Sequence, residues 1–189
     1  MGRMHQCVLI ISTLALCWFG MMAVHEAGHV LAAWLSGGTV AKVVLHPLTI
    51  SRTDLAENPM PLLVVWGGPM FGVGAPLTLW ALSQWARLPI AYLLRFFAGF
   101  CAIANGAYLG VGSFDRVGDA GDLLRHGALA WHLWLFGGIF VPAGILLWHG
   151  LGTRFGLGQG KGRVSVSAAY GCLIAATLLV ALMAFFGGD

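Results

Sequence analysis

The sequence predicts an all-α fold: a polytopic membrane helix bundle of about five spans, with a short β-ribbon after the first span. Hydrophobic residues make up 59% of the 189 residues and charged residues only 9%, and the mean hydropathy is +0.85. A soluble domain carries about a quarter charged residues, so this composition indicates an integral membrane protein. In addition, five apolar stretches reach the length of about 20 residues that a membrane-spanning helix needs.

The five apolar stretches follow one another with short connections, which predicts a single membrane-embedded domain over residues 1–189. We expect the first stretch to be retained as a span rather than removed as a signal peptide. A glycine-rich, basic segment over 150–163 is expected to form a flexible loop. The predicted spans cover roughly 7–35, 60–85, 89–111, 121–149 and 164–186.

The segment 36–59, after the first span, carries the predicted β-ribbon. It opens with "SGG", which stops a helix, and its β-branched residues, among them Val43 and Val44, favour extended chain. Pro47 interrupts this run, so we expect two short strands or an edge ribbon.

Charge excludes one class of partner. The net charge is only +3, and no basic block or basic-aromatic pattern occurs in the chain, so nucleic acid is not an expected partner.

The segment "HEAGH" places ionisable side chains inside the first apolar stretch. His25 and His29 are four residues apart, which puts both on one face of a helix. Two such imidazoles can bind one zinc ion, and Glu26 beside them can take a proton from water, as in the HExxH zinc proteases. Ionisable groups in a span are costly and usually functional, so we prefer metal binding to a chance match or to histidines that only form hydrogen bonds. His29 would lie about 9 Å from the end of the span.

A catalytic zinc site needs a third protein ligand. The loops after the first and third spans must lie on the same side of the membrane, so residues near 115–122 share that side with the end of the first span. Asp115, Asp119 and Asp122 are therefore candidates. At least two of them would be ordinary solvated charges.

An intramembrane HExxH, followed two spans later by an aspartate that opens another helix, resembles the site-2 protease family of intramembrane zinc metalloproteases. The segment "GDAGDLL" (118–124) is similar to the family signature in which the aspartate is the third zinc ligand. This resemblance implies Asp119 rather than Asp122 as the ligand that joins the two histidines. It covers roughly 25–124, so we expect the catalytic core over about 7–124.

Two further elements bear on the resemblance. "GGPMFG" (67–72) is similar to the family's Gly-Pro element, which implies that Gly68 and Pro69 lie near a bound substrate; close helix packing is the alternative interpretation. Gly72 departs from the family pattern, which usually has asparagine there. Asn105 either corresponds to the asparagine that precedes the family's aspartate motif or forms an interhelical hydrogen bond.

The resemblance implies an enzyme, a zinc metalloendopeptidase that hydrolyses peptide bonds in or next to transmembrane segments of membrane proteins, in the lipid bilayer of a bacterial cell membrane. The ribbon with Val43 and Val44 would either hold an unwound substrate by backbone pairing or only cover the site. Two alternatives are a pseudoprotease that binds segments without cutting them and a metal transporter. The intact Glu26 argues against the first, and the few polar residues elsewhere in the spans argue against the second.

Overall fold

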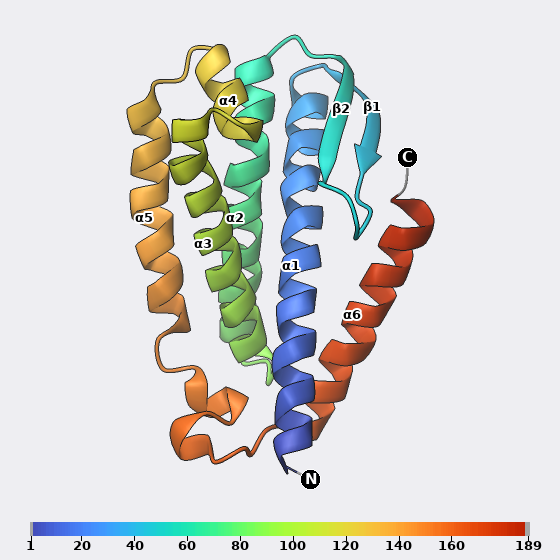
Figure 1. Ribbon diagram of the computed structural model, residues 1–189, viewed down its shortest axis with the longest axis vertical. Helices are drawn as coiled ribbons and strands as arrows, with labels where there is room; N and C mark the ends of the chain where they lie inside the picture. Colours follow the sequence, from blue (N-terminus) through green and yellow to red (C-terminus); the bar gives the residue numbers. More distant parts are fainter. Residues whose placement is uncertain (1, 188–189) are drawn as a thin grey trace.

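The computed structural model describes residues 2–187, which form six α-helices and one two-stranded antiparallel sheet (Figure 1). Five of the helices, α1, α2, α3, α5 and α6, are long and apolar enough to cross a membrane. The predicted fold class is thus confirmed. The elements are α1 Gly2–Leu35, β1 Thr39–Val44, β2 Arg52–Glu57, α2 Pro61–Trp85, α3 Ala91–Asp115, α4 Gly118–Arg125, α5 Ala130–Trp148 and α6 Val166–Phe186.

The predicted fourth span, 121–149, is wrong as a single helix. It divides into the eight-residue α4 and the spanning helix α5. Gly127 has φ +97° and ends α4 in a Schellman motif, because its N–H bonds to the carbonyl of Leu124 and the next N–H, of Ala128, bonds to that of Leu123. The first helix also begins earlier than predicted, at Gly2, and the third ends later, at Asp115.

The segment 150–163, which the sequence predicts to be a flexible loop, contains regular structure. It folds into two short 3-10 helices, η1 Gly152–Phe155 and η2 Gly158–Gly160. Phe155 is buried and packs in one cluster with Leu9 near the start of α1. The segment therefore closes this end of the bundle with a small apolar core.

Helix α1 lies in the middle of the bundle, with α2, α3 and α5 on one side and α6 on the other (Figure 1). The β-hairpin and α4 lie together at one end of the bundle, which we call the site end. The start of α1 lies with η1 and η2 at the other end, which we call the opposite end. The prediction that the segments after the first and third spans share one side is thereby confirmed.

Glycines allow α1 and α2 to approach closely at the level of the HEAGH segment. A Cβ atom on Gly28 would collide with the carbonyl oxygen of Gly67, and one on Gly67 would lie 2.7 Å from the carbonyl oxygen of Gly28. Small residues at a helix crossing let the backbones touch. This crossing brings the two histidines of α1 against α2.

Candidate metal centre

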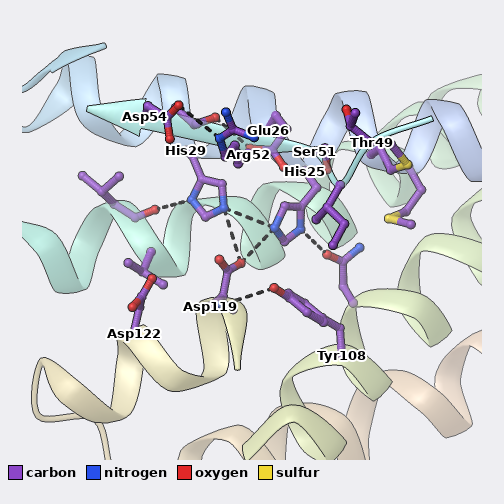
Figure 2. Close-up of a pocket in the computed structure, with 18 of the residues that line it drawn as sticks. His25, Glu26, His29, Thr49, Ser51, Arg52, Asp54, Tyr108, Asp119 and Asp122 are labelled. Carbon is purple, nitrogen blue, oxygen red and sulfur yellow. Dashed lines mark hydrogen bonds and ion pairs between the residues drawn. The ribbon is translucent and has the colours of Figure 1, made fainter. Parts of the chain in front are cut away.

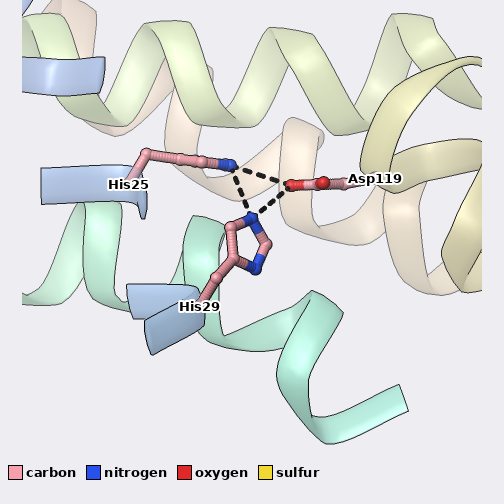
Figure 3. Close-up of side chains that lie close together, drawn as sticks. All are labelled: His25, His29 and Asp119. Atoms are coloured by element: carbon pink, nitrogen blue, oxygen red, sulfur yellow. Dashed lines mark hydrogen bonds and ion pairs between the residues drawn. The ribbon is translucent and has the colours of Figure 1, made fainter. Parts of the chain in front are cut away.

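Three side chains converge between α1 and α4 (Figure 3). Asp119 Oδ2 lies 2.9 Å from His25 Nε2 and 3.3 Å from His29 Nε2, and the two Nε2 atoms are 3.1 Å apart. His25 and His29 are buried, each 8% exposed. Within residues 2–187 this is the one group of histidine, cysteine or carboxylate side chains that could hold a metal ion.

The hydrogen bond made by His29 Nδ1 determines which ring nitrogen of the neutral imidazole carries the hydrogen. His29 Nδ1 lies 2.9 Å from the backbone carbonyl oxygen of Val64 in α2. A carbonyl oxygen can only accept, so Nδ1 carries the hydrogen and donates it. The Nε2 atom of His29 therefore presents a lone pair towards Asp119.

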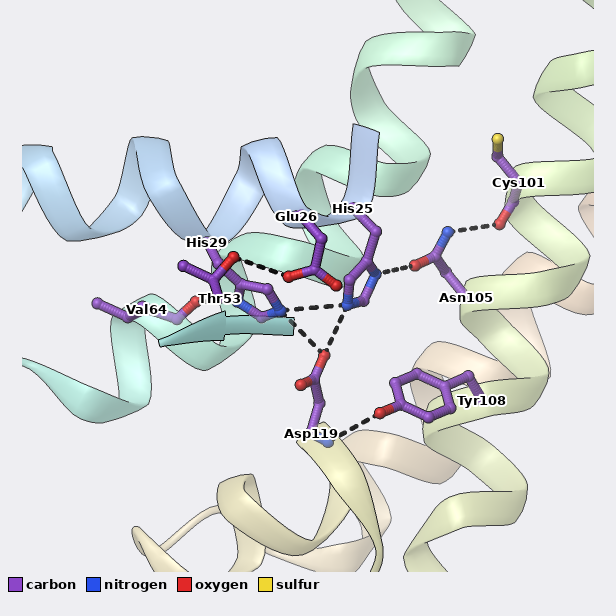
Figure 4. A network of polar contacts seen from close by, with 9 residues as sticks. All are labelled: His25, Glu26, His29, Thr53, Val64, Cys101, Asn105, Tyr108 and Asp119. Atoms are coloured by element: carbon purple, nitrogen blue, oxygen red, sulfur yellow. Dashed lines mark hydrogen bonds and ion pairs between the residues drawn. The ribbon is translucent and has the colours of Figure 1, made fainter. Parts of the chain in front are cut away.

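The same reasoning holds for His25 through Asn105 of α3 (Figure 4). The Asn105 side-chain nitrogen donates to the carbonyl oxygen of Cys101 at 2.9 Å, which assigns the orientation of the amide. Its oxygen then faces His25 Nδ1 at 2.6 Å and accepts the proton. Asn105 thus forms an interhelical hydrogen bond, one of the two roles that the sequence leaves open.

Two imidazole lone pairs and a carboxylate oxygen therefore face one another. Three electron-rich atoms at such short separations repel unless a proton or a metal cation lies among them. The outer nitrogens of metal-bound histidines commonly donate to carbonyl or amide oxygens, as those of His25 and His29 do here. The donor set formed with Asp119 therefore fits a divalent cation.

Helix α4 brings Asp119 to the histidines from its first turn. The Asp119 N–H donates to the hydroxyl oxygen of Tyr108 at 3.1 Å. Gly118 has φ +54°, and a Cβ atom there would collide with the same hydroxyl. Burial by itself would raise the pKa of Asp119, and hydrogen bonds donated by the rings of His25 and His29 in their protonated form lower it. The ionised carboxylate is the form that a metal would bind.

Two glycines of α2 make room for these side chains. A Cβ atom on Gly68 would collide with the ring of His29 and lie 2.9 Å from His25 Nε2, and one on Gly72 would lie 2.8 Å from the amide oxygen of Asn105. The predicted site residue Gly68 therefore lies directly against the imidazoles.

Asp122, the alternative third ligand, does not join the histidines. Its carboxylate instead forms an ion pair with Arg125 one turn further along α4, with a distance of 2.7 Å. The structure thus brings Asp119, and not Asp122, to His25 and His29.

A cavity of about 1160 Å³ lies beside the three side chains, between α1, α3, α4 and the hairpin (Figure 2). His25, Glu26, Asn105 and Asp119 are among the residues that line it. Glu26 is only 3% exposed, so its carboxylate is held at the wall of the cavity and away from bulk solvent.

Asn105 lines this cavity, whereas the other four predicted substrate residues do not. Gly68, Pro69, Val43 and Val44 are not among the lining residues. Pro69 is buried within α2, and Val44 is fully buried. The hairpin residue that contacts the candidate centre comes from β2 instead: Thr53 donates a hydrogen bond to Glu26.

Sequence reasoning missed Thr53, Tyr108 and the carbonyl of Val64. Tyr108 follows Asn105 by three residues and so lies on the same face of α3, a signal that could have identified it. Thr53 and Val64 carry no such signal, because their roles depend on how the hairpin and α2 pack on α1.

Comparison of the chain with protein-family models, with curated proteins and with solved structures finds no match.

Proposed function

We propose that the protein is an intramembrane zinc metalloprotease that cleaves peptide bonds in or next to transmembrane segments of membrane proteins. The observation that carries this proposal is the convergence of His25, His29 and Asp119, with Glu26 at the wall of the same cavity. The resemblance of the two motifs to the site-2 protease family supports it.

Zinc is the metal that this donor set suits. Two histidine nitrogens and one carboxylate oxygen, with a further position open, are typical of catalytic zinc sites. The ligand atoms lie 2.9, 3.1 and 3.3 Å apart, close to the spacing of about 3.3 Å between ligands around a tetrahedral zinc ion. Zinc held there supplies Lewis acidity, which polarises a carbonyl group and lowers the pKa of water to about 7.

The protein's own residues supply the rest of the reaction. Glu26 acts as the general base that takes a proton from the attacking water and then as the acid that delivers it to the leaving amine. Asn105 and the carbonyl of Val64 hold the two imidazoles in the tautomer that binds metal. The cavity of about 1160 Å³ gives water and a substrate segment room beside Glu26.

A transmembrane substrate must unwind before a peptide bond is accessible, because its helical hydrogen bonds shield the backbone. Strands β1 and β2 pair only with each other within residues 2–187, so each has one edge without a strand neighbour. Such an edge can hold an extended segment by backbone pairing. We propose this role for the hairpin.

The proposal is tested with purified protein, its zinc content and a substrate that has one transmembrane segment. Glu26→Gln is expected to keep zinc and to abolish cleavage, because the amide cannot accept the proton. Glu57→Gln is the matched control, since Glu57 is an exposed residue of β2, and it is expected to cleave like wild type. Cleavage that survives Glu26→Gln would reject the mechanism, and zinc flux into liposomes without cleavage would favour a transporter.

A further inference from the structure

The hydroxyl group of Thr53 contacts the proposed general base directly. Thr53 Oγ1 donates a hydrogen bond to Glu26 Oε2 at 2.7 Å (Figure 4). This bond joins β2 to α1, across 27 positions of the sequence. It is the one hydrogen bond that the Glu26 side chain makes within the described part of the chain.

Glu26 needs an external restraint. A glutamate carboxylate on a flexible stem, next to a divalent cation, is itself a good zinc ligand. If Glu26 bound the ion, it would occupy the open position and could no longer act as a base. A hydrogen bond to Oε2 restrains the carboxylate and leaves Oε1 free to accept a proton.

The hairpin is packed firmly enough to provide that restraint. Leu55, two residues after Thr53 and therefore on the same face of β2, packs with Val40 against Ala33 and Val64. Thr53 also pairs with Val43 of β1 in the antiparallel ladder. Apolar packing on α1 and α2 thus fixes the register that places the hydroxyl beside Glu26.

We propose that Thr53 is a positioning residue: its hydroxyl anchors Glu26 Oε2, keeps the carboxylate away from the metal and directs Oε1 into the cavity. This inference rests on the proposed function. It gives the hairpin a part in catalysis that differs from covering the site or holding a substrate.

Steady-state cleavage by two Thr53 variants tests the proposal, one without the hydroxyl group and one that keeps it. Thr53→Val keeps the shape but removes the donor, and is expected to lower kcat by about 10- to 100-fold with KM and zinc content nearly unchanged. Thr53→Ser restores the donor and is expected to recover most of kcat. Thr177→Val is the matched control, since Thr177 is an exposed residue of α6 that does not line the cavity, and it should leave kcat unchanged.

A second measurement reports on Glu26 without any cleavage. In the cobalt-substituted protein, wild type and Thr53→Ser should share one visible absorption spectrum. Thr53→Val should change that spectrum, because the released carboxylate of Glu26 approaches the ion. An unchanged cobalt spectrum together with an unchanged kcat in Thr53→Val would overturn the proposal. If wild type binds cobalt but cleaves no substrate, the proposed function fails, and the cobalt spectra alone decide the role of Thr53.

Discussion

The two ends of the helix bundle differ in charge. The hairpin, the end of α3 and α4, which lie at the site end, hold five carboxylates and four basic residues: Asp54, Glu57, Asp115, Asp119 and Asp122, with Lys42, Arg52, Arg116 and Arg125. The start of α1, the connection between α2 and α3, and the segment 150–163, which lie at the opposite end, hold five basic residues and no carboxylate: Arg3, Arg87, Arg154, Lys161 and Arg163.

Polar side chains also have different partners at the two ends. Two long polar side chains of the opposite end bond to single backbone carbonyls: Gln6 donates to Phe155 at 3.0 Å, and Arg95 donates to His149 at 3.0 Å. These bonds satisfy backbone oxygens near the ends of helical segments. At the site end, His25, His29 and Asp119 point at one another. Convergence of three possible ligand atoms, rather than the mere presence of polar groups, therefore distinguishes the end that holds the candidate metal centre.

The largest effect on metal binding is expected from the third ligand. Asp119→Asn removes the charged oxygen that faces both histidines, so zinc affinity should fall by more than about 100-fold, the largest loss expected when a ligand only loses its hydrogen-bond partner. Asp122→Asn is the matched control, since Asp122 pairs with Arg125 and not with the histidines, and should change the affinity less than about 2-fold. Titration with a competing chelator measures both; a larger loss in Asp122→Asn would contradict the assignment of the ligand.

A single methyl group on α2 should have the next largest effect. Gly68→Ala places a Cβ atom against the ring of His29, and the displaced imidazole should weaken zinc binding by about 100-fold. Gly74→Ala, on the same helix, meets open space and should leave the affinity unchanged. Equal zinc affinity in the two variants would show that the imidazoles do not occupy this position.

Asn105 should matter less, because it acts through a ligand. Asn105→Leu removes the acceptor for His25 Nδ1, and we expect a loss of about 10-fold in zinc affinity. Ser113→Ala on the same helix removes a hydroxyl that bonds Gly110 and Trp134 instead, so chelator titration should give the wild-type value. The assigned tautomer of His25 is wrong if Asn105→Leu binds zinc like wild type.

The smallest effect on the metal should come from the opposite end. Phe155→Ala removes a buried ring and should lower the free energy of unfolding by about 3 kcal/mol, without changing zinc per folded chain. Phe185→Ala is its control, because Phe185 is 85% exposed. Thermal unfolding and metal analysis on the same samples separate the two effects. Loss of zinc from folded Phe155→Ala would show that the two ends are coupled.

The histidine pair could be predicted from sequence because a spacing of four residues fixes its geometry on one helix. Asp119 needed the resemblance, since the side of the membrane alone left three aspartates as candidates. The break between α4 and α5 could have been predicted from Gly127, which ends α4. Thr53 could not be predicted, because the register of the hairpin against α1 is set by packing between residues far apart in sequence.

The most direct test of the central claim is zinc X-ray absorption on the purified protein, together with the amount of zinc per chain. We predict one zinc ion per chain, with two imidazole nitrogens and a carboxylate oxygen at about 2.0–2.2 Å, and loss of the imidazole signal in His25→Ala combined with His29→Ala. A zinc content in wild type no higher than in that double variant would contradict a metal centre formed by His25, His29 and Asp119.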